Sequence, residues 1–138
     1  MAELDEADAR SEFRRGLDAL PGLERGDALH HRRDNVPPRV LHRLARGLYA
    51  VQDEIDLHLA DAAQAEVLLR RFLGEARAAG FGCVRVIHGK GLHSEGSLPV
   101  LKNVVDRILR QRADVLAFHS APAAQGGTGA VLVLLSSR

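Results

Sequence analysis

The chain contains few aromatic residues and a single cysteine. Its 138 residues include four Phe, one Tyr and no Trp, which argues against an aromatic platform that stacks single-stranded nucleic acid. Because Cys83 has no second cysteine to pair with, an internal disulfide is excluded and a reducing compartment is favoured. No apolar run approaches the ~20 residues that cross a bilayer, and the acidic start lacks the features of a signal peptide. We therefore expect a cytoplasmic protein with no membrane partner.

Acidic and basic side chains are separated along the first third of the chain. Residues 1–24 carry seven acidic and three basic side chains, whereas residues 25–46 carry six arginines and two aspartates, together with three histidines. A basic segment of this kind attracts nucleic-acid phosphates. It is equally typical of a solvated linker that pairs with the acidic leader, and the sequence leaves both interpretations open.

The sequence divides into an N-terminal extension, residues 1–50, and a compact domain, residues 51–138. The extension starts with a stretch of helix-forming composition, residues 2–20, and continues as a polar, poorly ordered linker as far as Pro38. A short helical segment is compatible with residues 39–47. We therefore expect an acidic helix followed by a basic linker in front of the domain.

Strand and helix patterns alternate through the compact domain. Short apolar strands are predicted at residues 54–57, 83–87, 115–120 and 130–135, and two amphipathic helices are predicted between the first three of them. The first helix has an N-cap at Asp61, a stop at Gly80 and a predicted buried face of Ala65, Leu68, Leu69, Phe72 and Ala76; the second begins near Ser97 and Pro99. The order β-α-β-α-β-β predicts an α/β fold, here a two-layer α+β sandwich with both helices on one face of a four-stranded mixed sheet. The last strand should run antiparallel, because the loop before it is too short for a crossover helix.

Three of the predicted strands end in a histidine: His58, His88 and His119. Functional groups in an open α/β sheet gather at the carboxyl ends of parallel strands. We therefore expect the three imidazoles to approach one common rim.

Asp56 lies two residues before His58, on the same face of the strand. A carboxylate in that position fixes the imidazole tautomer and supports a positive imidazolium. Such a histidine acts as a general base or acid. The alternative is a polar pair on the solvated face of an edge strand.

Two glycine-rich loops are candidates for contact with a phosphate. Gly89-Lys90-Gly91 lets backbone N–H groups approach an anion and adds a lysine charge, and residues 126–129 form the second loop. Neither the Walker A spacing nor the dinucleotide fingerprint is present. Either loop is also explained as a tight turn that needs positive φ.

The sequence gives little support for a metal site or a cysteine nucleophile. Asp56, His58, His88 and His93 carry atoms that ligate metals, but their spacing matches no zinc or calcium pattern. Cys83 precedes a strand without a placed base and is typical of a small buried residue. We assign no metal ligand.

Five motifs together resemble the Smr (small MutS-related) domain. They are Asp56-Leu57-His58, His88-Gly89-Lys90-Gly91, residues 98–102, the segment 117–121 and Gly126-Gly127-Thr128-Gly129-Ala130, and the resemblance covers roughly residues 51–138. The stretch from Pro38 to Glu54 is similar to the lead-in of stand-alone bacterial Smr proteins. The resemblance implies a fold similar to the C-terminal domain of bacterial translation initiation factor three. It also implies endonuclease activity, because Smr proteins include enzymes that nick DNA and enzymes that cut messenger RNA on stalled ribosomes.

The resemblance places the family's Asp-x-His motif on Asp56 and His58, and its His-Gly-x-Gly motif on His88, Gly89 and Gly91. The family commonly has Leu-Asp-Leu-His-Gly, whereas this chain has Leu59 after His58. The leucine brings a bulky side chain to a point where the backbone approaches substrate.

We therefore expect a monomeric phosphodiester hydrolase that acts on DNA or RNA, with Asp56, His58 and His88 as catalytic residues. A histidine can activate the 2′-hydroxyl of RNA without metal, whereas hydrolysis of DNA needs an attacking water and favours a divalent ion, Mg²⁺ or Mn²⁺. The alternative is a non-catalytic module that binds nucleic acid or the ribosome through the same rim. The expected substrate-binding residues are Gly89, Lys90, Gly91, His93, His119, Gly126, Gly127, Thr128 and Gly129.

Overall fold

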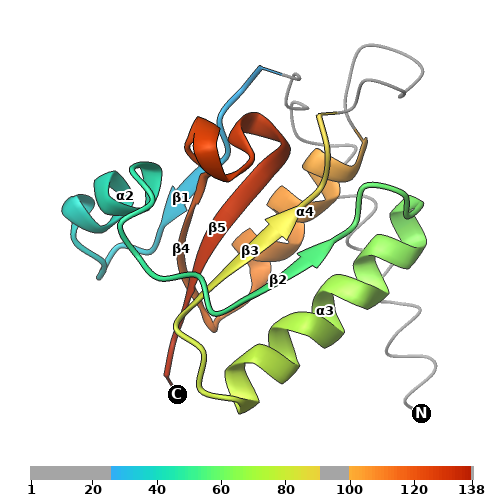
Figure 1. Ribbon diagram of the computed structural model, residues 1–138. Coiled ribbons are helices and arrows are strands. Elements are labelled where there is room, and N and C mark those ends of the chain that lie inside the picture. The colour runs from blue at the N-terminus through green and yellow to red at the C-terminus, as the bar shows by residue number, and fades with distance from the viewer. Residues whose placement is uncertain (1–25, 91–99, 138) are drawn as a thin grey trace.

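The computed structural model describes residues 26–90 and 100–137 (Figure 1). Within these residues a single five-stranded sheet is flanked by three α-helices. The strands are β1 (His30–Arg32), β2 (Asp53–Asp56), β3 (Cys83–Ile87), β4 (Val115–Ser120) and β5 (Ala130–Leu135), and the helices are α2 (Pro38–Ala45), α3 (Ala62–Ala78) and α4 (Val100–Gln111). Two short 3₁₀ turns, η1 (Ala123–Gln125) and η2 (Gly127–Gly129), lead into β5. None of the described helices is long and apolar enough to cross a membrane.

The sheet is mixed, with the strand order β1-β4-β5-β3-β2. β2 runs parallel to β3, and β5 runs antiparallel to both β3 and β4, as the short loop before it predicted. The α/β class and the antiparallel last strand are therefore confirmed. β5 lies between β3 and β4, so these two strands are not neighbours, which matters for the position of His119.

The fifth strand, β1, comes from a segment that the sequence assigned to a poorly ordered linker. That prediction is wrong for these residues, because His30–Arg32 pairs antiparallel with β4. The backbone N–H of Leu29 donates to Ser120 Oγ (2.8 Å), and the N–H of Ser120 donates to the Leu29 carbonyl (2.7 Å). Because the Leu29 side chain is buried in the main core, the folded unit extends N-terminal of the boundary predicted at residue 51.

Helix α3 starts and stops where its sequence predicts. The Asp61 side chain accepts from the Gln64 N–H and the Gln64 side chain accepts from the Asp61 N–H, which together make a capping box. Gly80 follows the helix with φ +79°, a backbone conformation that favours glycine. One detail of the predicted face is wrong: Leu68 is exposed, and Leu73 is buried in its place.

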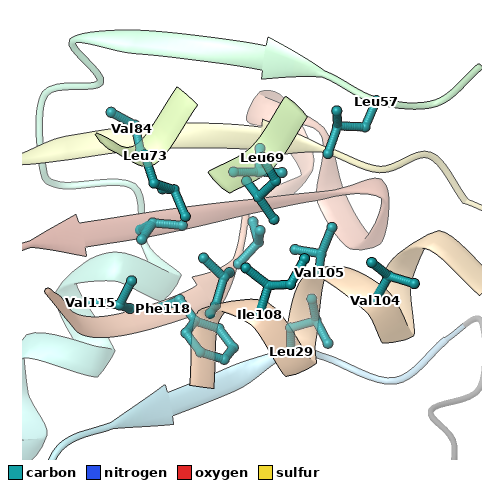
Figure 2. Packing of buried hydrophobic residues seen from close by; sticks show 14 of the residues in the cluster. Leu29, Leu57, Leu69, Leu73, Val84, Val104, Val105, Ile108, Val115 and Phe118 are labelled. Atoms are coloured by element: carbon teal, nitrogen blue, oxygen red, sulfur yellow. The ribbon is translucent and has the colours of Figure 1, made fainter. Parts of the chain in front are cut away.

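The main core lies between the sheet and the pair α3 and α4, as Figure 2 shows. A second, smaller core lies on the opposite face, where α2 covers β4 and part of β5. It contains Val36, Leu44, Cys83, Ala117, Ala121, Ala130 and Leu132. Helices α3 and α4 lie on one face of the sheet, as predicted. Helix α2 covers part of the other face, so the predicted two-layer arrangement gains a partial third layer. The predicted acidic helix of residues 2–20 and the predicted start of the second helix, residues 97–99, lie outside the described residues.

Candidate active site

Asp56 and His58 form a hydrogen-bonded pair at the carboxyl end of β2. The imidazole Nδ1–H of His58 donates to Asp56 Oδ1 at 2.6 Å, and the backbone N–H of His58 donates to the same oxygen at 3.0 Å. Leu57, between them, points into the core, so the pair lies on the outer face with each side chain about half exposed. Because Nδ1 carries the proton in this bond, Nε2 of His58 is left as the basic atom.

The pKa of Asp56 lies below its ordinary value. Partial burial alone raises the pKa of this carboxyl, but the hydrogen bonds from the backbone and the imidazole of His58 outweigh it. The carboxylate is therefore ionised at neutral pH and accepts the Nδ1–H bond. This geometry confirms that the two side chains share one face and contact each other.

Gly89 lies directly against His58. β3 pairs in parallel with β2, and its last residue, Ile87, accepts the N–H of Leu57 at 2.7 Å. Gly89 follows with φ +84°, and a Cβ added to it would lie 3.2 Å from the Cβ of His58. A glycine is needed here for two reasons, the left-handed backbone and the close approach to the histidine.

The second glycine-rich loop is bound to the first through the backbone. The N–H groups of His88 and Gly89 each donate to the Gly129 carbonyl at 3.0 Å. A Cβ on Gly129 would lie 3.1 Å from Cγ of Lys90 and 3.4 Å from the Gly89 carbonyl carbon. Gly89, Lys90 and Gly129 therefore meet, and the two glycine-rich loops form one surface.

His88 is buried, with 2% of its surface exposed. Its Nδ1–H donates to the Gly89 carbonyl at 2.8 Å, and Nε2 has no hydrogen-bond partner among the described residues. The pKa of His88 is lowered to about 4, chiefly because the imidazole is buried; the bond to the Gly89 carbonyl opposes this shift, and the nearby positive charge of Lys102 adds to it. His88 is neutral at pH 7, and in this arrangement it orients the turn that faces His58.

A shallow groove of about 410 Å³ lies beside the turn, lined by residues of β3, the turn and η1. Its cationic residues are Lys90 and Arg85, and Arg85 pairs with Glu54 Oε1 at 2.8 Å and donates to the Gln125 carbonyl at 3.4 Å. Sequence reasoning missed Arg85, although a charged residue in an apolar strand was a usable signal. Of the predicted second loop, Gly126 and Gly129 line this groove.

His119 does not join the other two histidines. Its ring stacks on His30 of β1, with centroids 6.2 Å apart, and its Nδ1–H donates to the Ser120 carbonyl. β5 separates β4 from β3, so the expectation that the three imidazoles approach one rim is wrong for His119. The turn after His88 lies against His58, but the His88 imidazole itself is buried. The predicted site residues Gly91 and His93 lie outside the described residues.

The remaining predicted residues have separate surroundings. Gly127 and Thr128 form part of η2, and Gly127 has φ +57°. Cys83 is buried in the second core, and burial raises the pKa of its thiol to about 11, which agrees with a packing role. Within the part of the chain that the structure describes, no three His, Cys, Asp or Glu side chains gather into a metal site.

The sequence and the fold both match a known class of domain. The family model of the Smr domain matches residues 55–136, and the chain therefore belongs to the Smr domain family. The crystal structure of YdaL, a stand-alone small MutS-related protein from Escherichia coli, is similar with a TM-score of 0.73 and 29% identity, covering 85% of this chain and 89% of that one. The Smr domain of Thermus thermophilus MutS2 is similar with a TM-score of 0.53 and 34% identity, covering 60% of this chain and 96% of that one.

Two relatives are named ribosome rescue factor SmrB. The chain is 35% identical over 117 residues to ribosome rescue factor SmrB of Aliivibrio fischeri, which is 85% of this chain and 63% of that protein. It is 36% identical over 126 residues to ribosome rescue factor SmrB of Vibrio vulnificus, which is 91% of this chain and 68% of that protein. The chain thus spans a little under two thirds of the length of the Aliivibrio relative.

Proposed function

We propose that this protein acts on RNA at the ribosome, in the cytoplasm, and that the Asp56–His58 pair cleaves the RNA backbone. The observation that carries the proposal is the 2.6 Å bond between His58 Nδ1 and Asp56 Oδ1. It holds the imidazole in one tautomer, with a basic Nε2, on a half-exposed surface beside a glycine turn. The ribosome rescue name of the relatives supports RNA as the substrate.

The chemistry requires only groups of this chain and of RNA, together with a proton from solvent. His58 Nε2 accepts the proton of a 2′-hydroxyl, whose oxygen attacks the adjacent phosphorus. The P–O2′ bond forms as the P–O5′ bond breaks, which leaves a 2′,3′-cyclic phosphate and a 5′-hydroxyl that takes its proton from solvent. Lys90 and Arg85 supply positive charge beside the phosphate, whose negative charge is spread over its oxygens in the transition state.

A basic stripe on α2 supports contact with the RNA backbone away from the cleaved bond. It consists of Arg39, His42, Arg43 and Arg46, which are all exposed and are spaced i, i+3, i+4 and i+7 along one side of the helix. Gly47, at the end of this helix, lies within 4 Å of the Gln125 side chain, measured from an added Cβ, and Gln125 lines the groove of Arg85 and Lys90. The stripe therefore leads toward the groove.

A second candidate function is binding to the ribosome or its RNA without cleavage. The name of the relatives and the basic stripe support this function as well as they support cleavage. The two candidates differ only in what the Asp56–His58 pair does.

The test is the His58→Ala variant, with His30→Ala as the matched control because His30 is an exposed histidine on β1, at the opposite edge of the sheet from β2. We expect His58→Ala to lose about 10²–10⁴-fold in the rate of RNA cleavage, the usual contribution of a general base, and to keep its affinity for RNA. His30→Ala should cleave normally. If the wild-type protein leaves both structured RNA and matched DNA intact, with and without Mg²⁺ or Mn²⁺, the cleavage function is wrong and the binding function stands.

A further inference from the structure

An apolar groove of about 760 Å³ begins at the Asp56–His58 pair and follows the first turns of α3. Its walls are Leu59, Ala60, Ala63, Val67 and Leu68. Three of these are large side chains that face water: Leu59 is 87% exposed, Val67 48% and Leu68 41%. A single exposed leucine needs no explanation, but a cluster of apolar side chains around one groove indicates a binding surface.

The position of the groove restricts what fills it. Asp56 and His58 are themselves part of its lining, so an occupant of the groove lies next to the imidazole. A protein partner in this position would cover His58 and keep RNA away from it. An occupant that is compatible with cleavage is therefore a part of the RNA itself, adjacent to the bond that His58 acts on.

A nucleobase fits these requirements. Its two faces are flat and apolar, and its edges are polar, so aliphatic walls pack against the faces without hydrogen bonds. The sugar–phosphate backbone of the same nucleotide would then lie at the charged end of the groove, where His58 is half exposed. In a duplex the faces of the base are covered by its stacked neighbours, whereas an unpaired base can be splayed out.

We propose that the apolar groove binds the base of an unpaired nucleotide next to the cleaved phosphate, so that the protein selects single-stranded RNA. The proposal rests on the proposed cleavage function and adds the substrate feature that the site recognises. It also assigns a role to Leu59, because this leucine, unlike the glycine common at this position in the family, provides an apolar wall next to His58.

The test uses a single-stranded oligonucleotide with 2′-O-methyl groups at every position but one, so that only one bond can be cut. Two further versions carry an abasic nucleotide directly before or after that bond. For the wild-type protein we expect one abasic version to lose about tenfold in kcat/KM, which corresponds to roughly 1.4 kcal/mol. The Leu59→Ser and Leu68→Ser variants should lose a similar factor on the intact substrate and show little further loss on the abasic one.

The control is Leu48→Ser, which changes an exposed leucine outside the groove and should leave all rates unchanged; its exposed fraction, 60%, lies between those of Leu68 and Leu59. Leu68 serves as the second groove variant because it lies on α3 and is not adjacent to His58 in the chain. The proposal is overturned if the wild-type protein cuts intact and abasic substrates equally well. It is also overturned if the losses from the abasic nucleotide and from Leu68→Ser multiply, as for independent sites.

Binding measurements separate this proposal from the cleavage function. In the His58→Ala protein, fluorescence anisotropy should give a weaker affinity for the abasic oligonucleotide than for the intact one, and the added Leu68→Ser change should abolish the difference. If the wild-type protein cuts no RNA but this difference is present, the cleavage function fails and base binding is supported. If the affinities are equal, base binding fails whether or not the protein cleaves.

Discussion

Replacement of Gly89 by alanine tests how the turn after β3 controls His58. Gly89 has φ +84°, and a residue with a Cβ pays about 1–2 kcal/mol to adopt the left-handed region. The new Cβ would lie 3.2 Å from the Cβ of His58, closer than ordinary carbon contacts of about 3.5–4.0 Å. His58 must therefore move by a few tenths of an ångström, and its bond to Asp56 must adjust with it.

Gly80→Ala is the matched control for this substitution. Gly80 has φ +79°, and among the residues that the structure describes no atom outside its chain neighbours lies within 4 Å of an added Cβ. The two variants should therefore lose comparable stability, about 1–2 kcal/mol each, which lowers Tm by roughly 3–10 °C for a domain of this size. Only Gly89→Ala places a new atom against the Cβ of His58, the atom that carries the imidazole.

The two variants should separate in activity. A misplacement of about 1 Å in a catalytic group costs on the order of 10²-fold, so the smaller shift forced here should lower kcat/KM for RNA cleavage by roughly tenfold. Gly80→Ala should cleave at the wild-type rate below its Tm. The assay is cleavage of a fluorescent single-stranded RNA, with Tm measured on the same preparations. Equal activity of the two variants would show that the contact between Gly89 and His58 does not control the imidazole.

Three further results are expected. Asp56→Asn should lower kcat for RNA cleavage by roughly 10²–10⁴-fold with little change in KM, measured in single-turnover experiments, because the amide no longer fixes Nδ1–H. The pair Arg39→Gln and Arg43→Gln should reduce the slope of log K against log salt by about 1.5, measured between 50 and 200 mM salt as phosphate contacts are lost. The pKa of His88 is about 4 in the folded protein and about 6.5 in the unfolded chain, so between these pH values the unfolded chain binds one more proton than the folded protein. The free energy of unfolding, measured by urea denaturation, should therefore fall by about 3 kcal/mol as pH decreases from about 6.5 to 4.

Specific outcomes would contradict these expectations. Full activity of Asp56→Asn would mean that the carboxylate does not orient the imidazole. An unchanged salt slope would make the basic stripe a solvated helix face, as one interpretation of the sequence allowed. If His88→Asn shows the same loss of stability at low pH as the wild type, the loss comes from other groups. Deletion of residues 1–46 is not a useful substitute for the arginine variants, because it removes Leu29 and Leu44 from the two cores.

The sequence predicts those strands and helices whose residue pattern lies within the segment itself. The four strands β2 to β5 and helix α3 follow from apolar periodicity and from the signals of Asp61 and Gly80. β1 has no such pattern, because His30–Arg32 is a three-residue edge strand without apolar alternation. It forms because it pairs with β4 and because Leu29, just before it, is buried, which is information from distant parts of the chain.

The same difference applies to the candidate site. The spacing of Asp56 and His58 on one strand is local, and it predicts a contact that is present. The position of His119 depends on the order of strands in the sheet, which the sequence does not state, and the insertion of β5 carries it away from His58. The burial of His88 likewise depends on segments that are distant in the chain, including Gly129, whose carbonyl accepts its backbone N–H.

The arrangement of the site explains how a half-exposed histidine keeps a fixed orientation. Side chains at a surface lose rotamer freedom when they are held, and exposed ion pairs alone contribute little to holding them. Here the backbone restrains the imidazole: Gly89 packs against the Cβ of His58, and the Gly129 carbonyl accepts the N–H groups of His88 and Gly89. A side chain on Gly89 would displace His58, and one on Gly129 would displace Lys90. The contacts that join His58, Gly89 and Gly129 are therefore closely packed. The bond to Asp56 then orients the ring and selects its tautomer, and the imidazole Nε2 stays available to a substrate.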